Sequence, residues 1–118
     1  MRDILSINMT DKKNEVFQGS LELLILRVLQ SGDRHGYGIA KRIEQVSGGA
    51  FSINMGSLYT ALNRLLRKGH VETEWGEAET GRRAKFYALT DSGRAQVDVE
   101  IEQWNAGIAG VQRIIENA

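Results

Sequence analysis

The hydrophobic period of this 118-residue sequence changes twice along the chain, and these changes restrict the folds it can adopt. Apolar residues recur at helical spacing as far as Lys68, alternate with polar residues between Val71 and Leu89, and return to helical spacing after Asp91. Recurrence every three to four residues is typical of an amphipathic helix, whereas strict alternation is typical of a half-buried strand. The sequence therefore predicts a mainly helical fold interrupted by one β-hairpin.

Three amphipathic helices are predicted before the hairpin. The first follows Ser20, a candidate N-cap, and ends before Gly32. The second covers residues 37–46, and the third runs from about residue 56 to residue 68 with Asn54 as its cap. One apolar stripe of each helix is expected to face a shared core. The expected core residues are Leu21, Leu24, Ile25, Val28 and Leu29 in the first helix, Ile39, Ile43 and Val46 in the second, and Leu58, Ala61, Leu62 and Leu65 in the third.

The alternating region predicts two strands, Val71 to Trp75 and Lys85 to Leu89, joined by a loop over residues 76–83. Thr90 and Asp91 then begin a final helix that continues to about Glu116. Three short helices followed by a two-stranded hairpin make up a winged helix-turn-helix. The predicted fold class is therefore mainly α with a small β-hairpin, a winged helix-turn-helix followed by a long C-terminal helix.

The final helix carries a coiled-coil seam. Its apolar residues are spaced alternately by four and three positions, at Val97, Ile101, Trp104, Ile108, Val111 and Ile115. At 1.5 Å per residue the helix extends about 40 Å, beyond the reach of so small a core, so packing within its own domain is the weaker explanation. Leu23 and Leu26 also lie off the stripe of the first helix, and a twin subunit would cover them. We therefore expect a homodimer whose interface includes all eight residues.

The formal net charge is zero, but the charges are distributed unevenly. Between residues 19 and 69 seven Lys and Arg residues stand against three acids, and no acid occurs between Glu44 and Glu72. From residue 91 to residue 118 five acids stand against two Arg residues. The first region can therefore face phosphate, while the last region avoids it.

The outer face of the third helix has the chemistry of a recognition helix. In a helix-turn-helix the second of the paired helices enters the major groove of DNA. Asn63 suits adenine, and Arg64 suits guanine or phosphate. An ordinary solvated face explains one such helix about as well, but the long acid-free stretch favours nucleic acid. The face carries hydroxyls, one amide and two guanidiniums, from Ser57, Tyr59, Thr60, Asn63, Arg64 and Arg67.

The hairpin loop places three cations, Arg82, Arg83 and Lys85, within four positions, directly after Gly81. Glycine lets the backbone of a turn approach another surface closely. Lys and Arg also protect exposed hairpin edges from aggregation, and for this loop alone that explanation is the stronger one. Together with the third helix, the loop is better explained as a wing that grips phosphates.

Six segments of the sequence resemble the PadR-like regulators of bacteria, in the order in which the family has them. They are LELLILRVL (21–29), HGYGIAKR (35–42), GSLYTAL (56–62), EWG (74–76), GRRAK (81–85) and LTDSG (89–93). The resemblance covers residues 19–104 and is closest to the short members with a single C-terminal helix. It implies a dimeric winged-helix repressor in which the helix that begins at GSLY reads the major groove and the GRRAK hairpin touches the DNA backbone.

The resemblance also implies a role for individual residues. Some short members bind planar aromatic compounds between their subunits, and Trp104 stands where the stacking aromatic would lie. The implied partners are double-stranded operator DNA with two half-sites, a second copy of the chain and a planar aromatic effector. The implied DNA contacts are Tyr37, Lys41, Ser57 and Tyr59 on phosphates, Thr60, Asn63 and Arg64 nearest the bases, and Arg82, Arg83 and Lys85 on the wing.

Two other classes of function fit the sequence less well. An enzyme would have to work with His35 and His70, without cysteine and without a His cluster at metal-ligand spacing, so we expect no catalytic residues, metal or cofactor. A winged-helix protein-protein interaction module without DNA binding is the alternative, but it would need acidic or apolar residues on the outer face of the third helix. We therefore predict a sequence-specific DNA-binding transcriptional regulator, a repressor released by a small-molecule effector.

The sequence divides into three parts on this interpretation. Residues 1–18 form a flexible N-terminal arm, residues 19–90 the winged helix-turn-helix DNA-binding domain, and residues 91–118 the C-terminal dimerisation helix. A hydrophobic content of 42% suits one modest core. No cysteine and no long apolar run occur, so we expect a cytoplasmic protein without disulfides or membrane segments.

Overall fold

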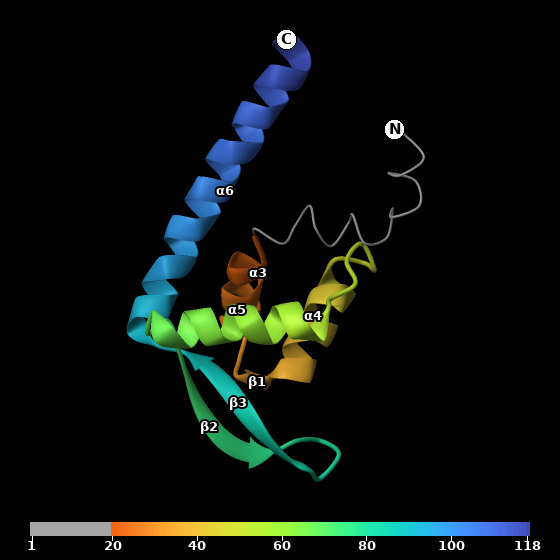
Figure 1. Cartoon of the computed structure of the whole chain (residues 1–118), viewed down its shortest axis with the longest axis vertical. Coiled ribbons are helices and arrows are strands. Elements are labelled where there is room, and N and C mark those ends of the chain that lie inside the picture. Colours follow the sequence, from red (N-terminus) through yellow and green to blue (C-terminus); the bar gives the residue numbers. More distant parts are fainter. Residues whose placement is uncertain (1–19) are drawn as a thin grey trace.

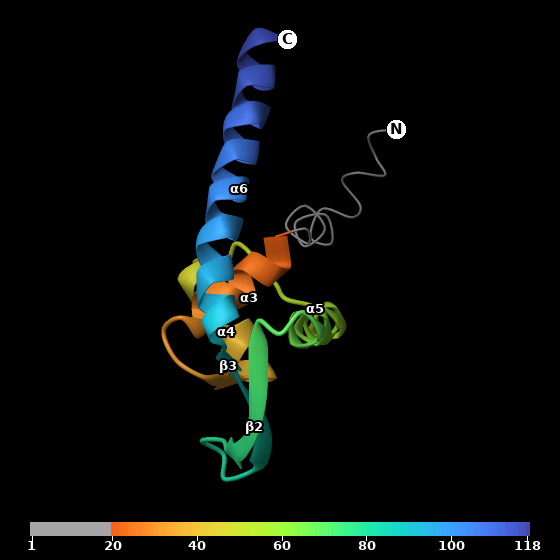
Figure 2. The ribbon, with the colours of Figure 1, turned by 90° about the vertical axis from the view of Figure 1, so that its left-hand side faces the viewer.

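The computed structural model describes residues 20–118, and the predicted N-terminal arm lies outside this range. Helices α3, α4 and α5 form a head from which the β2–β3 hairpin and helix α6 extend in opposite directions (Figures 1 and 2). The fold class predicted from the sequence is confirmed. The elements are α3 (Leu21–Leu29), β1 (Arg34–His35), α4 (Gly36–Val46), α5 (Met55–Arg67), β2 (Val71–Glu77), β3 (Arg83–Leu89) and α6 (Asp91–Asn117).

The sheet has three antiparallel strands in the order β1-β3-β2. The hairpin register pairs Val71 with Leu89 at its base and Trp75 with Lys85 further out. Strand β1 was not predicted, because two residues are too short to show any alternation; they pair with Tyr87 and Phe86 of β3. Through β1 the hairpin is hydrogen-bonded to the segment directly before α4, which fixes its position on the head.

The core lies where α3, α4 and α5 meet the base of the hairpin. Of the twelve predicted core residues, nine are buried, and Leu24 and Val28 are partly buried against the same cluster. Val46 was predicted wrongly: its side chain is 67% exposed, since it occupies the last turn of α4. The fully buried large side chains are Ile25, Leu26, Ile39, Leu58, Leu62, Leu65 and Val97.

Two residues assigned to a dimer interface belong to the core of the single chain instead. Leu26 and Val97 are both 0% exposed, so neither has surface left for a partner. The reason is that α3 contacts α4, α5, β3 and also α6 of its own chain, so its second apolar side is covered without a twin subunit. Leu23 is buried as well, at 8% exposure, but it lies outside the core cluster.

Helix α6 is attached firmly to the turn between α5 and β2. Thr90 caps the helix, because its Oγ1 accepts a hydrogen bond from the Gly93 N–H at 3.1 Å, and it donates to the Gly69 carbonyl at 2.6 Å. A Cβ atom at Gly93 would collide with the carbonyl oxygen of His70, so the two backbones touch. The direction of α6 is therefore tied to the end of α5.

No helix within residues 20–118 has the length and apolar character needed to span a membrane.

Candidate nucleic-acid interface

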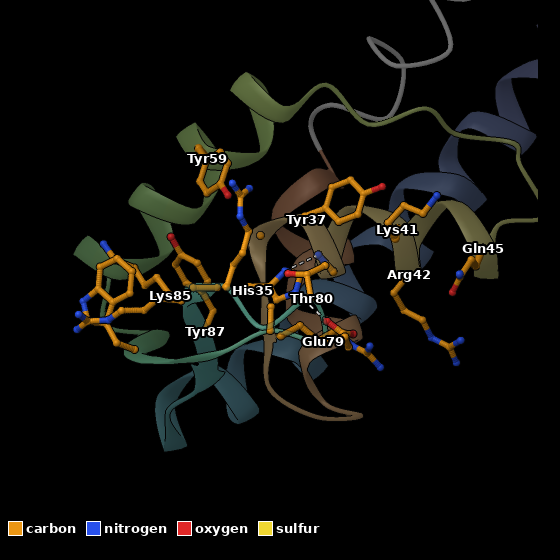
Figure 3. Close-up of a pocket in the computed structure, with 18 of the residues that line it drawn as sticks. His35, Tyr37, Lys41, Arg42, Gln45, Tyr59, Glu79, Thr80, Lys85 and Tyr87 are labelled. Carbon is orange, nitrogen blue, oxygen red and sulfur yellow. Dashed lines mark hydrogen bonds and ion pairs between the residues drawn. The ribbon is translucent and has the colours of Figure 1, made fainter.

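A wide open groove of about 1020 Å³ lies between α4, the outer face of α5 and the β2–β3 hairpin with its loop (Figure 3). The lining side chains come from three separate parts of the sequence, which the fold brings to one face. Seven of the ten predicted DNA-contact residues line it: Tyr37, Lys41, Tyr59, Asn63, Arg82, Arg83 and Lys85.

The groove is strongly positive. Glu79 is the one carboxylate among its lining residues, against six cationic side chains. Three of these cations were predicted as wing contacts and Lys41 as a phosphate contact, whereas Arg34 and Arg42 were not assigned a role. Low-dielectric walls that carry charge of one sign concentrate the field and attract polyanions. The surface is therefore suited to a phosphate backbone.

His35 organises the first turn of α4. Its Nδ1 accepts a hydrogen bond from the Gly38 N–H at 3.0 Å, so the side chain caps the helix. A neutral imidazole that accepts at Nδ1 carries its proton on Nε2, and this nitrogen lies 3.4 Å from Glu79 Oε1. Hydrogen bonds from its own backbone N–H and from His35 lower the pKa of the Glu79 carboxyl. The capping role of His35 was not predicted from the sequence.

Tyr59 connects α5, the predicted recognition helix, to α4. A Cβ atom at Gly36 would collide with the phenol, whose Cζ would lie only 2.7 Å away. Glycine at position 36 therefore lets the Tyr59 ring lie against the first turn of α4. The ring is still 43% exposed toward solvent. The HGYG and GSLY segments, noted separately in the sequence, thus form one contact.

The remaining three predicted contacts, Ser57, Thr60 and Arg64, lie on another flank of α5. They line a separate hollow of about 420 Å³. The start of the helix is capped as predicted, with the Asn54 side chain accepting from the Ser57 N–H at 2.9 Å. Thr60 Oγ1 donates to the Gly56 carbonyl at 3.0 Å. The predicted contact set is therefore split between two sides of α5.

Arg64 forms an ion pair with Glu22, which lies 42 positions earlier in the sequence. Its Nε lies 2.7 Å from one oxygen of Glu22 in α3, and Lys68 Nζ lies 2.9 Å from the other. Partial burial raises the pKa of the Glu22 carboxyl, but the hydrogen bonds and charges of Arg64 and Lys68 outweigh this and hold it below its ordinary value. The outer face of α5 was expected to be free of acids, and this expectation is wrong near its C-terminal end, where Glu22 of α3 reaches Arg64 and Lys68. A base contact by Arg64 stays a prediction.

Trp75 was predicted as part of an alternating strand and given no binding role. In the structure its side chain is 56% exposed and it lines the groove. The guanidinium carbon of Arg83 lies 4.9 Å from the ring centroid, and Lys85 Nζ lies 5.7 Å from it. The signal in the sequence was the spacing of one aromatic residue and two cations across a short hairpin.

Residues 20–118 contain no cluster of three or more His, Asp or Glu side chains placed to hold a metal ion.

Comparisons with known proteins agree with this geometry. The model of the transcriptional regulator PadR-like family matches residues 25–99. Uncharacterized protein X of Lysinibacillus sphaericus is 30% identical over 88% of this chain and 92% of its own length. Transcriptional regulator YqjI of Escherichia coli is 33% identical over 72% of this chain and 39% of its own length.

Two solved structures extend the comparison. A transcriptional regulator from Clostridium thermocellum superposes with a TM-score of 0.75 at 29% identity, covering 84% of this chain and 93% of that protein. Bacillus subtilis PadR, solved in complex with operator DNA, gives a TM-score of 0.60 at 27% identity, covering 69% of this chain and 46% of that protein. The resemblance noted in the sequence is confirmed, and the chain belongs to the PadR-like family of transcriptional regulators.

Proposed function

We propose that this protein is a sequence-specific regulator that binds double-stranded operator DNA through the groove between α4, α5 and the hairpin. The observation that carries this proposal is the convergence of six cations and the exposed face of α5 on one concave surface. Helix α5 enters the major groove, where Asn63 reads a base edge, and Arg82, Arg83 and Lys85 follow the backbone. The operator complex of Bacillus subtilis PadR supports this placement by analogy.

A homodimer supplies the second DNA-binding head. The 27-residue helix α6 is about 40 Å long at 1.5 Å per residue, and its first turns alone reach the core through Val97 and Ile101. Beyond them the predicted seam is open, with Ile108, Val111 and Ile115 exposed by 47%, 54% and 70%. Apolar residues at alternating spacings of four and three favour a second α6 as their partner. Two heads would then contact half-sites about one helical turn apart.

The regulator acts as a repressor in this proposal, and a planar aromatic effector releases it from DNA. Trp104 lies on the seam and is half-buried in the single chain. An added Cβ at Gly107 would meet no atom within 4 Å, so the helix has open space one turn further on. A flat ligand between two indole rings would fit such a gap, and the coupling of α6 to the end of α5 would carry its effect to DNA.

A binding selection from random and genomic duplexes tests the proposed function. We expect enrichment of a two-fold symmetric site with two half-sites, bound with an affinity that falls steeply as salt increases. Asn63→Ala should relax preference at one base pair, and Arg82→Ala should weaken binding to all duplexes and lower the salt slope by about one. If a folded protein enriches no duplex at physiological salt, the proposal fails and the winged-helix protein-interaction module becomes the better explanation.

A further inference from the structure

The EWG segment (74–76) carries an exposed aromatic residue, Trp75, to which the proposed docking of DNA gives no role. Trp75 on β2 stands opposite Lys85 in the hairpin register, and Arg83 lies two residues earlier in β3, nearer the loop. Both cations lie near the Trp75 ring, with the Arg83 guanidinium carbon 4.9 Å and Lys85 Nζ 5.7 Å from its centroid. These distances are within the range at which a cation is attracted to the face of an indole.

The hairpin does not need Trp75 to keep its shape. The other side of the same region is held by Phe86, whose ring would lie 3.1 Å from a Cβ at Gly76 and whose centroid is 5.3 Å from that of His35. The base of the hairpin enters the core through Val71, Tyr87 and Leu89. Trp75 itself is 56% exposed and belongs to no core cluster. The Trp75 ring therefore contacts Arg83 and Lys85 and does not pack into the core.

An ordered cation binds phosphate better than a free one. Long Lys and Arg side chains lose rotamer freedom when they are fixed at an interface, and pre-ordering removes part of that cost. Side chains two residues apart on a strand point to the same face and are separated by roughly 7 Å. This is close to the separation of neighbouring phosphates along one DNA strand.

We propose that Trp75 is a positioning residue of the wing, which holds Arg83 and Lys85 in the orientation that binds two neighbouring phosphates of one strand. This inference rests on the proposed function, because it takes DNA as the ligand of the groove. Trp75 acts through the two cations and adds no charge of its own. Its removal therefore lowers the number of phosphate contacts without changing the net charge of the protein.

The test combines Trp75→Leu with the double variant Arg83→Ala/Lys85→Ala, using a labelled duplex that the wild type binds. Two exposed cation–π contacts predict that Trp75→Leu weakens binding roughly five- to thirtyfold. The slope of log affinity against log salt should fall by up to about two, at roughly 0.9 per phosphate contact. Trp75→Phe, which keeps a ring, should retain most of the affinity. In the Arg83→Ala/Lys85→Ala background, Trp75→Leu should change affinity by less than about twofold, since no cation remains to be positioned.

Two controls separate positioning from folding and from the broader proposal. Thr73→Ala changes an exposed residue of the same strand and should leave affinity and salt slope unchanged. In the DNA-free protein, the Arg83 Nε–H resonance should show a ring-current shift that Trp75→Leu abolishes while the melting temperature is kept. If Trp75→Leu binds DNA with wild-type affinity and salt slope, the inference is wrong and the proposed function still stands. The inference is also wrong if Trp75→Leu loses as much affinity in the Arg83→Ala/Lys85→Ala variant as it does in the wild type. Failure of the wild type to bind any duplex would overturn the proposed function as well.

Discussion

The phenol ring of Tyr59 occupies the space that a Cβ atom on Gly36 would need, so α5 and the first turn of α4 meet through a glycine. The contact joins two segments that are 23 positions apart in the sequence, and both of them line the groove. The orientation of Tyr59 and the position of Tyr37 on α4 are therefore linked.

Gly36→Ala should separate DNA binding from stability. Alanine favours a helix over glycine by up to about 1 kcal/mol, and the partly exposed Tyr59 ring can swing outward, so the free energy of unfolding should change little. The displaced ring should nevertheless weaken operator binding, which a titration with labelled duplex measures. In a Tyr59→Ala background, Gly36→Ala should have no further effect on affinity. Additive losses would show that the contact does not organise the groove.

Gly93→Ala should destabilise the fold much more than Gly36→Ala. The obstacle at Gly93 is the backbone carbonyl of His70, which cannot rotate away as a side chain can. Forcing an extra carbon into such a contact costs on the order of 1–3 kcal/mol, measurable by urea unfolding. Gly107→Ala on the same helix is the control, because nothing lies within 4 Å of an added Cβ there. Equal stability of the two variants would contradict the tight joint between α6 and the α5–β2 turn.

The sequence predicted most of the fold because the signals for it are local. Hydrophobic period located the helices, Asn54 forms the predicted cap of α5, and α6 begins after Thr90 as predicted. The predicted cap of α3 was wrong, because the Ser20 side chain makes no capping hydrogen bond there.

Apart from the α3 cap and Val46 at the end of α4, the errors come from packing between distant segments. Leu26 and Val97 were placed at a dimer interface because nothing local reveals that α3 and α6 of one chain cover each other. Strand β1 depends entirely on its pairing with β3.

The candidate site was predictable in its residue types but less so in its pairings. The cations of the loop and the polar face of α5 are visible as sequence runs, and the structure brings Asn63 and Arg82 to the same groove. The pairs that modify this surface are far apart in the chain. Glu22 and Arg64 are 42 positions apart, and His35 and Glu79 are 44 apart. Only the fold reveals that these acids reach the basic face.

Glu22→Gln should change both stability and DNA binding. The folded protein holds the pKa of Glu22 below its ordinary value of 4.5, so the carboxylate stabilises the fold above that pH. The contribution is lost as pH falls through the lowered pKa. At neutral pH the variant should therefore be less stable by about 1 kcal/mol or less, because Arg64 and Lys68 are about half exposed. As the pH falls below 4.5, the difference in unfolding free energy should shrink.

The same substitution tests whether Arg64 contacts DNA. Removing the acid releases the guanidinium and takes one negative charge from the edge of the interface, so operator affinity and salt slope should both rise, the slope by about one. Glu116→Gln, at the far end of α6, removes one charge away from the groove and serves as the control. Unchanged affinity in Glu22→Gln would exclude a DNA contact by Arg64.

The exposed half of the α6 seam should hold the dimer together. Ile108→Asp with Ile115→Asp places two charges where a partner helix would bury them, so the protein should sediment as a monomer. The head should stay folded by circular dichroism, because both residues are exposed in the single chain. Operator affinity should fall with the loss of the second head. Ala106→Asp, on the opposite side of α6 by heptad position, should remain dimeric. A dimeric double variant at micromolar concentration would place the interface elsewhere.

Trp104 should bind a planar aromatic ligand between the two α6 helices. Trp75 is the other tryptophan of the chain, so Trp75→Phe leaves Trp104 as the single indole fluorophore. A planar cationic dye titrated into this variant should quench the emission saturably and release bound operator. Trp104→Ala should lose dye affinity, and Gly107→Leu should lower it by filling the open space one turn further along α6. The five acids of residues 91–118 also attract a cation, but that attraction is screened above about 0.5 M salt, whereas stacking persists. Equal dye affinity in wild type and a dimeric Trp104→Ala would leave Trp104 as plain interface core.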